Sequence, residues 1–343
     1  MGFAMMPGKI RVEEHAAPSL VDPFGRRIYY LRISVTDRCN LRCVYCLPER
    51  GVRWLPRDEI LSFEEVRAVV GVAARLGISH VRITGGEPLV RRDLPQLISM
   101  LAEIPDLADL ALTTNGILLA QHARALARAG LKRINISLDT LDATRFREVT
   151  RFGSISDVFA GLDAALEAGL EPLKLNVVVV RGVNDDEIPT LAKLSTERPL
   201  HVRFIEFMPI GGYFSREKLV PAAEIMSRVQ EIGPLEPAET PRGCGPARTF
   251  RYPGACGTVG LIAAVTRSFC AQCNRLRLTA TGQLRPCLDD QAAESLLPAL
   301  RPEPNFEKLA ELIRLTVARK PEHHTMAERD AGDPRFCMSG VGG

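Results

Sequence analysis

The chain has 343 residues, of which 46% are hydrophobic and 25% are charged, and its formal net charge is +3. These values are typical of a soluble globular protein with one large domain and a second unit, and the small net charge argues against a nucleic-acid scaffold. No apolar run approaches the ~18 residues of a membrane helix. Residues 1–24 lack the apolar segment of a signal peptide and are expected to form an N-terminal extension. Nine cysteines without such a signal indicate the cytoplasm and metal binding rather than disulfides.

Between residues 25 and 233, apolar strands alternate with amphipathic helices. The helix that begins after Ser62 is the clearest, because Ser62 and Glu65 form a capping-box pair and Gly77 follows its end. The alternation predicts an α/β fold whose parallel sheet is covered by helices, and six repeats fit an incomplete (β/α)6 barrel. The expected strands are Ile28–Val35, His80–Thr84, Leu110–Thr114, Arg133–Leu138, Leu173–Val180 and Val202–Phe207. The expected helices are Ser62–Leu76, Leu94–Glu103, Ile117–Ala129, Val158–Ala168, Glu187–Leu194 and Ala222–Ile232.

The pattern changes near Pro234, where Pro, Gly and Glu become dense. Short strands and one helix follow, so residues 234–343 are expected to form a smaller α+β unit packed against the open side of the barrel. The expected elements are the strands Thr249–Tyr252, Thr258–Ala264, Arg275–Thr279 and Gln283–Arg285 and the helix Phe306–Ala318.

Three cysteines, Cys39, Cys43 and Cys46, follow the first strand with the spacing C-x3-C-x2-C. Thiolates at this spacing can close on one metal centre. Structural zinc takes four ligands, and no fourth cysteine or histidine is near, whereas a [4Fe–4S] cluster held by three thiolates keeps one iron open for chemistry. Two simpler interpretations remain, a redox pair formed by Cys43 and Cys46 and buried apolar thiols.

Several expected strands end in glycine or polar residues. The second strand runs into Thr84-Gly-Gly-Glu-Pro88, the third into Asn115, the fourth into Asp139 and the sixth into Met208. Each segment alone is compatible with an ordinary turn. Together they indicate one functional rim beyond the carboxyl ends of the strands, where glycine lets a ligand approach the backbone.

A second triad, Cys270, Cys273 and Cys287, has the spacing C-x2-C-x13-C. It fits a second open [4Fe–4S] cluster, or a zinc site with Cys256 as a fourth ligand, and Cys244 and Cys337 remain without a role. In a strand, Arg275 and Arg277 share one face, which fits binding of a polyphosphate or, more simply, a solvated basic face. His323 and His324 are expected at the surface or at a helix cap.

The first triad, with Tyr45 before its last cysteine, resembles the signature of radical S-adenosylmethionine (SAM) enzymes. The match becomes specific at Leu31-Arg-Ile-Ser-Val-Thr-Asp-Arg-Cys39, at Arg82-Ile-Thr-Gly-Gly-Glu-Pro88 and at Phe269-Cys-Ala-Gln-Cys-Asn-Arg-Leu-Arg-Leu278. Together with the final Gly342-Gly343, these segments are similar to the GTP 3′,8-cyclases of molybdenum cofactor biosynthesis. Leu47 departs from the methionine usual in that family.

The resemblance implies roles for individual residues. It implies two [4Fe–4S] clusters, one on each cysteine triad, and SAM bound to the first. SAM contacts then fall on Tyr45, Gly86, Ser137 and Met208. GTP contacts fall on Arg32, Arg82, Thr113, Lys174, Arg275 and Arg277. Gly342 and Gly343 take part in catalysis, although on physical grounds alone a terminal glycine pair is expected to be a free tail.

The resemblance also implies the reaction. A 5′-deoxyadenosyl radical takes hydrogen from ribose C3′ of GTP, and the resulting radical attacks C8 to give 3′,8-cyclo-7,8-dihydro-GTP. The implied partners are an external electron donor and a downstream cyclic pyranopterin monophosphate synthase, with a homodimer also allowed and neither nucleic acid nor membrane involved. Two alternatives are kept, a radical SAM enzyme with an auxiliary cluster that acts on another substrate such as a peptide, and a non-enzymatic iron–sulfur or zinc module.

Overall fold

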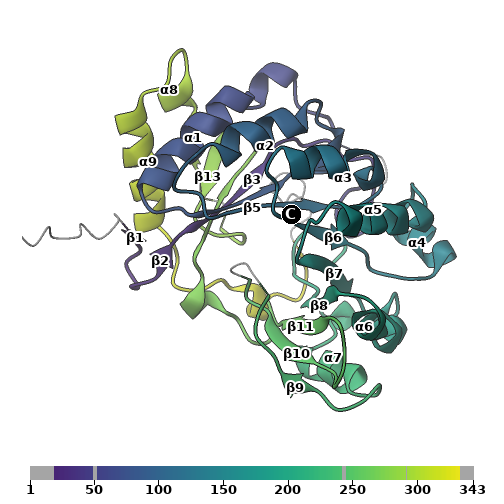
Figure 1. Cartoon of the computed structure of the whole chain (residues 1–343). Helices are drawn as coiled ribbons and strands as arrows, with labels where there is room; N and C mark the ends of the chain where they lie inside the picture. The colour runs from purple at the N-terminus through teal and green to yellow at the C-terminus, as the bar shows by residue number, and fades with distance from the viewer. Residues whose placement is uncertain (1–18, 49–51, 242–244, 291, 333–343) are drawn as a thin grey trace, which may run out of the picture.

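The computed structural model describes residues 19–48, 52–241, 245–290 and 292–332. One twelve-stranded sheet runs through this part of the chain, in the order β14-β13-β12-β3-β4-β5-β6-β7-β8-β11-β10-β9. Figure 1 shows that the sheet curves and that most helices lie along its outer side. The architecture is therefore α/β, as expected.

The centre of the sheet is a run of six neighbouring parallel strands in chain order. They are β3 (Tyr30–Ser34), β4 (His80–Thr84), β5 (Asp109–Thr114), β6 (Arg133–Ser137), β7 (Leu173–Val179) and β8 (Leu200–Glu206). All six expected strands are thus confirmed, each to within two residues at either end. Residues 28–35 were expected to form one strand, but they divide into the end of β2 (Arg27–Ile28) and β3.

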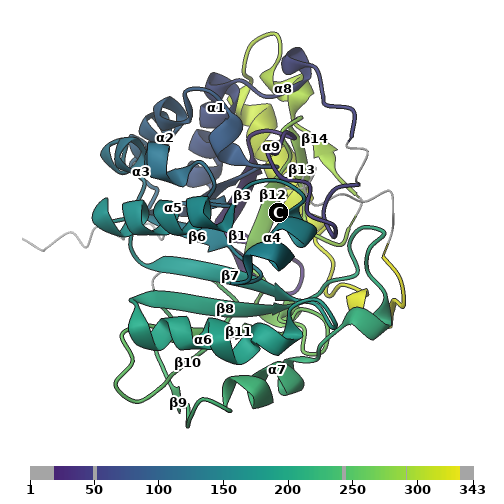
Figure 2. The same cartoon turned by 90° about the vertical axis from the view of Figure 1, so that its right-hand side faces the viewer.

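Helices connect the strands and cover one face of the sheet (Figures 1 and 2). That face is apolar, because alternate strand residues such as Leu31, Ile83 and Ile134 are fully buried in the main core cluster. The helices are α1 (Phe63–Arg75), α2 (Leu94–Ala102), α3 (Leu119–Arg128), α4 (Ala143–Thr150), α5 (Ile155–Glu167), α6 (Ile188–Glu197) and α7 (Ala222–Val229).

The chain beyond residue 234 adds strands to both edges of this sheet. On one edge, β11 (Thr258–Ile262) lies parallel to β8 and is followed outward by β10 (Arg248–Arg251) and β9 (Glu236–Pro237). On the other edge, β12 (Arg275–Leu278) lies parallel to β3, with β13 (Gln283–Arg285) and β14 (Glu294–Ser295) beyond it. The remaining elements are the hairpin of β1 (Leu20–Val21) with β2, and the helices α8 (Leu297–Leu300) and α9 (Phe306–Ala318).

The expected capping box of α1 is present and leads to a stability prediction. The Ser62 hydroxyl accepts from the Glu65 amide at 3.1 Å, and the Glu65 carboxylate accepts from the Ser62 amide at 2.7 Å. Ser62→Ala should therefore lower the free energy of unfolding by about 0.5–2 kcal/mol, measured by urea denaturation. Ser154→Ala is the matched control, since Ser154 precedes the equally long helix α5 without a capping bond from its side chain. Equal losses in both variants would contradict this role.

Candidate active site

The face of the sheet opposite the helices is polar and strongly basic. On β3, β4 and β12 the apolar residues Leu31, Ile83 and Leu276 point to one side, so Arg32, Arg82 and Arg277 point to the other. Arg32 lies beside Arg82 on one neighbouring strand and beside Arg277 on the other. Three guanidinium groups thus lie in one row across adjacent strands.

The row continues across the rest of the sheet. Lys174 on β7 lies beside Asn135 on β6, which in turn lies beside Thr113 on β5. With its amide oxygen facing them, Asn135 accepts from both Arg82 and Arg203. Arg275 lies two residues before Arg277 on β12, so it faces the same side as Arg277. All six residues expected to contact GTP therefore face the same side of the sheet. Arg203 on β8 joins them and was not predicted, although its place between the buried Val202 and Phe204 was a usable signal.

Little negative charge balances this face. Asp109 pairs with Arg133 through an Nε–Oδ1 contact of 2.8 Å. In the part of the chain that the structure describes, no ion pair joins Arg32, Arg82, Arg203 or Arg275 to a carboxylate. The Nε atoms of these four arginines are buried and lack a hydrogen-bond acceptor there. Buried donors of this kind are expected to have a ligand, and their charge selects an anion.

Burial and mutual repulsion change the acidity of these cations. Burial, together with the nearby positive charges of Arg203, Arg133 and Arg82, lowers the pKa of Lys174 to about 6. Burial and, among the neighbouring charges, mainly Arg82 lower the pKa of Arg203 to about 9. Lys174 and Arg203 also line a small recess together with Thr240, Pro241 and Thr258. An anion bound there would restore the protonated form of Lys174.

The first cysteine triad lies in the loop that follows β3. Cys39, Cys43 and Cys46 are half-buried and form no disulfide. A tight turn closes the loop, because the amides of Cys46 and Leu47 both donate to the Cys43 carbonyl, at 2.9 and 3.0 Å. Burial raises the pKa of Cys39 to about 11 and that of Cys43 further, so without a positive charge or a metal these groups stay thiols.

Among the described residues, no three His, Cys, Asp or Glu side chains already converge on a metal-binding geometry. Closing either cysteine triad on iron therefore requires some adjustment of side chains or loop. The donor set nevertheless fits an iron–sulfur cluster, since each triad offers three partly or fully buried thiols that form no disulfide.

The Gly85-Gly86-Glu87 turn after β4 packs directly on the loop that leads to the first triad. The Gly86 amide donates to the Thr36 carbonyl at 2.7 Å, and a Cβ on Gly86 would lie 2.4 Å from the Arg38 carbonyl oxygen. Only glycine fits there. The buried Glu87 carboxylate accepts from the Thr114 hydroxyl and the Asn115 amide, each at 2.7 Å. The ends of β3, β4 and β5 are thus joined in one rim, as the sequence suggested.

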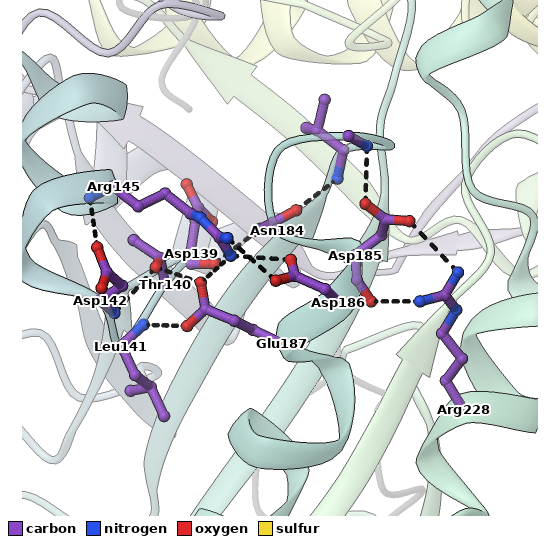
Figure 3. Close-up of polar contacts among 12 residues, drawn as sticks. Asp139, Thr140, Leu141, Asp142, Arg145, Asn184, Asp185, Asp186, Glu187 and Arg228 are labelled. Atoms are coloured by element: carbon purple, nitrogen blue, oxygen red, sulfur yellow. Dashed lines mark hydrogen bonds and ion pairs between the residues drawn. The ribbon is translucent and has the colours of Figure 1, made fainter.

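Tyr45 is held at the opposite side of this rim. Its hydroxyl donates to the Asp139 carboxylate, which also accepts from the Val178 amide at 2.8 Å. Asn184 donates to the Asp139 carbonyl at 2.7 Å, so the loop after β6 is tied to the end of β7 (Figure 3). Tyr45 and Met208 pack against the same small apolar cluster. Ser137, the last residue of β6, lies two residues before Asp139.

Figure 3 also shows how the loops after β6 and β7 are fastened to each other. The Glu187 carboxylate accepts from the Thr140 hydroxyl and, at 2.7 Å, from the Leu141 amide. Arg145 bonds the Asp186 carboxylate at 2.8 Å. These contacts hold the part of the rim that carries Asp139, and none of them was expected from the sequence.

The second triad lies at the other end of the adjacent strand. Cys270 and Cys273 precede β12, and continuing the register of β12 with β13 puts Cys287 beside Arg275. β12 and β3 are parallel neighbours, so the two triads lie beyond opposite ends of these strands. The five residues of β3 separate the triads by ~16 Å or more. The basic row lies between them. Cys256 is exposed in the turn between β10 and β11, and Cys244 and Cys337 lie outside the described residues.

The surroundings of the second triad are electropositive. Burial alone would raise the pKa of Cys270, but hydrogen bonds with His324 outweigh it and lower that pKa to about 7. Lys320 and Arg275 likewise lower the pKa of Cys273 against the effect of burial. His323 is exposed, as expected. The His324 side chain accepts from the Met326 amide at 3.3 Å, at the start of the short 3-10 helix Met326–Glu328, which agrees with the expected capping role. The interaction of His324 with Cys270 was not expected from the sequence.

Comparison with known proteins gives the class. The family model of the radical SAM superfamily matches residues 33–195, and the model described as Molybdenum Cofactor Synthesis C matches residues 200–326. The crystal structure of Streptococcus suis SuiB has the same fold, with a TM-score of 0.60 over 92% of this chain and 77% of that chain at 15% identity.

Curated relatives give the family. A GTP 3′,8-cyclase of Pelotomaculum thermopropionicum is 52% identical over 94% of this chain and 99% of its own length. A GTP 3′,8-cyclase of Moorella thermoacetica is 50% identical, with the same coverage of both chains. The chain belongs to the GTP 3′,8-cyclase family of radical SAM enzymes, whose members use [4Fe–4S] clusters and SAM. None of the described helices is long and apolar enough to cross a membrane.

Proposed function

We propose that this protein is a GTP 3′,8-cyclase, which converts GTP to 3′,8-cyclo-7,8-dihydro-GTP in the first step of molybdenum cofactor biosynthesis. The observation that carries the proposal is the basic row on β12, β3, β4 and β8, whose buried donors lie between two cysteine triads. A triphosphate supplies the missing negative charge, and planar guanidinium groups bind phosphate oxygens in bidentate fashion. A peptide substrate would not supply this charge, so the alternative substrate class is not favoured.

Cys39, Cys43 and Cys46 would hold the first cluster, and Tyr45, Gly86, Ser137 and Met208 would hold SAM. When bound, this cluster and SAM supply the 5′-deoxyadenosyl radical. The chain's own part is placement. The missing side chain of Gly86 lets its turn pack on the Arg38 backbone, which fixes the main-chain atoms that would contact SAM. Asp139 fixes the ring of Tyr45 through its hydroxyl.

Arg32, Arg82, Thr113, Lys174, Arg275 and Arg277 would hold GTP, and we add Arg203 to this set. Cys270, Cys273 and Cys287 would ligate the second cluster at the far end of the row. A nucleotide extended along the strands then has its triphosphate on the arginines and its base toward the second triad. The two triads are separated by ~16 Å, which is the length of about five strand residues at about 3.3 Å each. A nucleotide extended along the strands fits this distance.

The proposal also includes the division of the chain into two units. Residues 25–233 form an incomplete (β/α)6 barrel, and residues 234–343 form the unit that carries the second cluster. Thiols that must bind iron favour a reducing compartment, the cytoplasm. An external electron donor and a downstream cyclic pyranopterin monophosphate synthase are the expected partners, and a homodimer is compatible with the chain.

The direct test is anaerobic incubation of the reconstituted protein with SAM, dithionite and GTP, followed by mass analysis of the nucleotide. The product is an isomer of GTP, because the hydrogen atom that leaves C3′ is replaced by one electron from the reductant and one proton after C3′ bonds to C8. It is therefore expected as a nucleotide of unchanged mass that chromatography separates from GTP. Unchanged GTP beside full 5′-deoxyadenosine formation would reject the substrate.

We predict that Lys174 takes up a proton when GTP binds. Its pKa of about 6 in the unliganded protein means that it is mostly neutral at pH 8, and a bound phosphate raises that pKa again. Binding then takes up a proton above pH 6, so GTP affinity should fall as pH rises from about 6 to 8. Titration calorimetry in two buffers of different ionisation heat measures the uptake. Lys174→Arg, which does not titrate, should abolish this contribution. An uptake identical in both proteins would exclude Lys174.

Gly342 and Gly343, the predicted catalytic pair, lie outside the described residues. We predict that deleting both leaves iron content and SAM binding intact but blocks formation of the cyclic nucleotide. The matched variant, Gly342→Ala with Gly343→Ala, keeps the length of the chain and tests whether the absence of side chains is required. Full product yield from the shortened protein would mean that the tail has no part in the reaction.

A further inference from the structure

Lys320 is a buried cation beside the second cysteine triad. It follows the end of α9, which lies beside β13 (Figure 1), and its residue is only 3% exposed. Its ammonium group donates to the Arg275 carbonyl at 2.8 Å and to the Pro286 carbonyl. Arg275 is two residues from Cys273, and Pro286 directly precedes Cys287, so Lys320 joins the two chain segments that carry these cysteines.

The charge of Lys320 is not balanced by a carboxylate. Neither the hydrogen bonds nor the ion pairs of the described residues give its ammonium an acidic partner. The carboxylate of Asp22 is already paired with Arg26, which is itself a nearby cation. The acidic groups that do interact with Lys320 are the thiols of Cys273 and Cys287, which become negative only when they lose their protons. A buried ammonium without a counter-charge is strongly unfavourable, and two neutral thiols do not supply one.

Arg26 also holds this part of the site together, through hydrogen bonds to backbone carbonyls. Its guanidinium donates to the Cys270 carbonyl at 2.8 Å and to the Glu322 and Pro321 carbonyls at 2.7 and 2.6 Å. Arg26 thereby ties the segment just after Lys320 to the first cysteine of the triad. Because Asp22 neutralises Arg26, the positive charges that remain uncompensated beside Cys273 are those of Lys320 and of Arg275, which belongs to the basic row.

We propose that Lys320 is the charge-compensating and positioning residue of the second iron–sulfur cluster, and that it raises the reduction potential of that cluster. This inference rests on the proposed ligation by Cys270, Cys273 and Cys287. Ligating cysteines are thiolates, so a loaded site brings the negative charge that Lys320 lacks. Net charge and hydrogen bonds to the sulfur atoms set the potential of such clusters, and a fixed positive charge favours the state with one more electron.

The experiment uses the full-length protein with Cys39, Cys43 and Cys46 replaced by alanine, so that only the second cluster is loaded. Its iron content, about four per chain, tests the ligation separately from the role of Lys320. An anaerobic dithionite titration followed by electron paramagnetic resonance then gives the midpoint potential. Lys320→Gln keeps amide donors for the two carbonyls but removes the charge, whereas Lys320→Arg keeps the charge. Lys308→Gln, which replaces an exposed lysine of α9, is the matched control.

The expected result is a lower midpoint potential in Lys320→Gln, with Lys320→Arg and Lys308→Gln close to the parent protein. Loss of iron in Lys320→Gln together with retention in Lys320→Arg would equally support a requirement for the charge. An unchanged potential in a fully loaded Lys320→Gln protein would overturn the proposal, because the side chain would then be only a tether. Iron loss in Lys320→Arg as severe as in Lys320→Gln would overturn it as well.

Discussion

Replacing Cys39, Cys43 or Cys46 with alanine is expected to abolish SAM cleavage and to reduce iron from about eight to about four per chain, since one of two four-iron clusters is lost. Two ligands cannot hold the cluster, because burial raises the pKa of Cys39 and of Cys43 and so disfavours their thiolate forms. Anaerobic reconstitution, iron analysis and chromatography of 5′-deoxyadenosine measure both effects.

Cys256→Ala is the matched control for this experiment. Cys256 is an exposed free cysteine that belongs to neither triad, so its loss should leave iron content and SAM cleavage unchanged. Replacement of Cys270, Cys273 or Cys287 should remove the other half of the iron while SAM cleavage persists. Continued 5′-deoxyadenosine formation without Cys43 would refute the assignment of the first triad, and zinc in place of iron would refute both.

Arg275→Ala and Arg277→Ala should each weaken GTP binding about tenfold to a hundredfold. A charge-assisted hydrogen bond contributes roughly 1.5–3 kcal/mol, and every 1.4 kcal/mol corresponds to a factor of ten. Arg277 is 7% exposed and lies beside Arg32, so no water replaces the guanidinium easily. Arg277→Lys should recover only part of the loss, because an ammonium lacks the planar fork. Anaerobic equilibrium dialysis gives the affinities.

The control for the arginines is Arg248→Ala, which removes an exposed arginine from β10 and changes the net charge by the same amount. Its GTP affinity should equal that of the wild type, apart from a small change that disappears in salt. If Arg275→Ala and Arg277→Ala retain both clusters and wild-type affinity, the basic strand is a solvated face and GTP binds elsewhere.

Local patterns predicted most of the elements, because alternation and capping are encoded within a few neighbouring residues. The helix Phe306–Ala318 and the strand His80–Thr84 were predicted to the residue. Helix α4 was missed. Its buried residues are only Phe146, Val149 and Thr150, and Asp142, whose side chain accepts from the Arg145 amide, was its one clear signal.

The site was predictable where its residues lie in a motif or on an alternating strand, and not where distant segments meet. The cysteine spacing and the i, i+2 pair Arg275 and Arg277 could be read from the sequence. The contacts of Lys320 with the Pro286 carbonyl and of Tyr45 with Asp139 could not, because they depend on which strands become neighbours.

The placement of β12 beside β3 and of β11 beside β8 has a consequence for synthesis of the chain. Both ends of the six-stranded run are covered by segments that leave the ribosome last, so the nascent protein carries two open sheet edges until then. Pairing between such distant segments is slow to form. A chain that stops before residue 258 would keep both edges unpaired and should aggregate through them. The basic face of such a chain would also lack the arginines of β12.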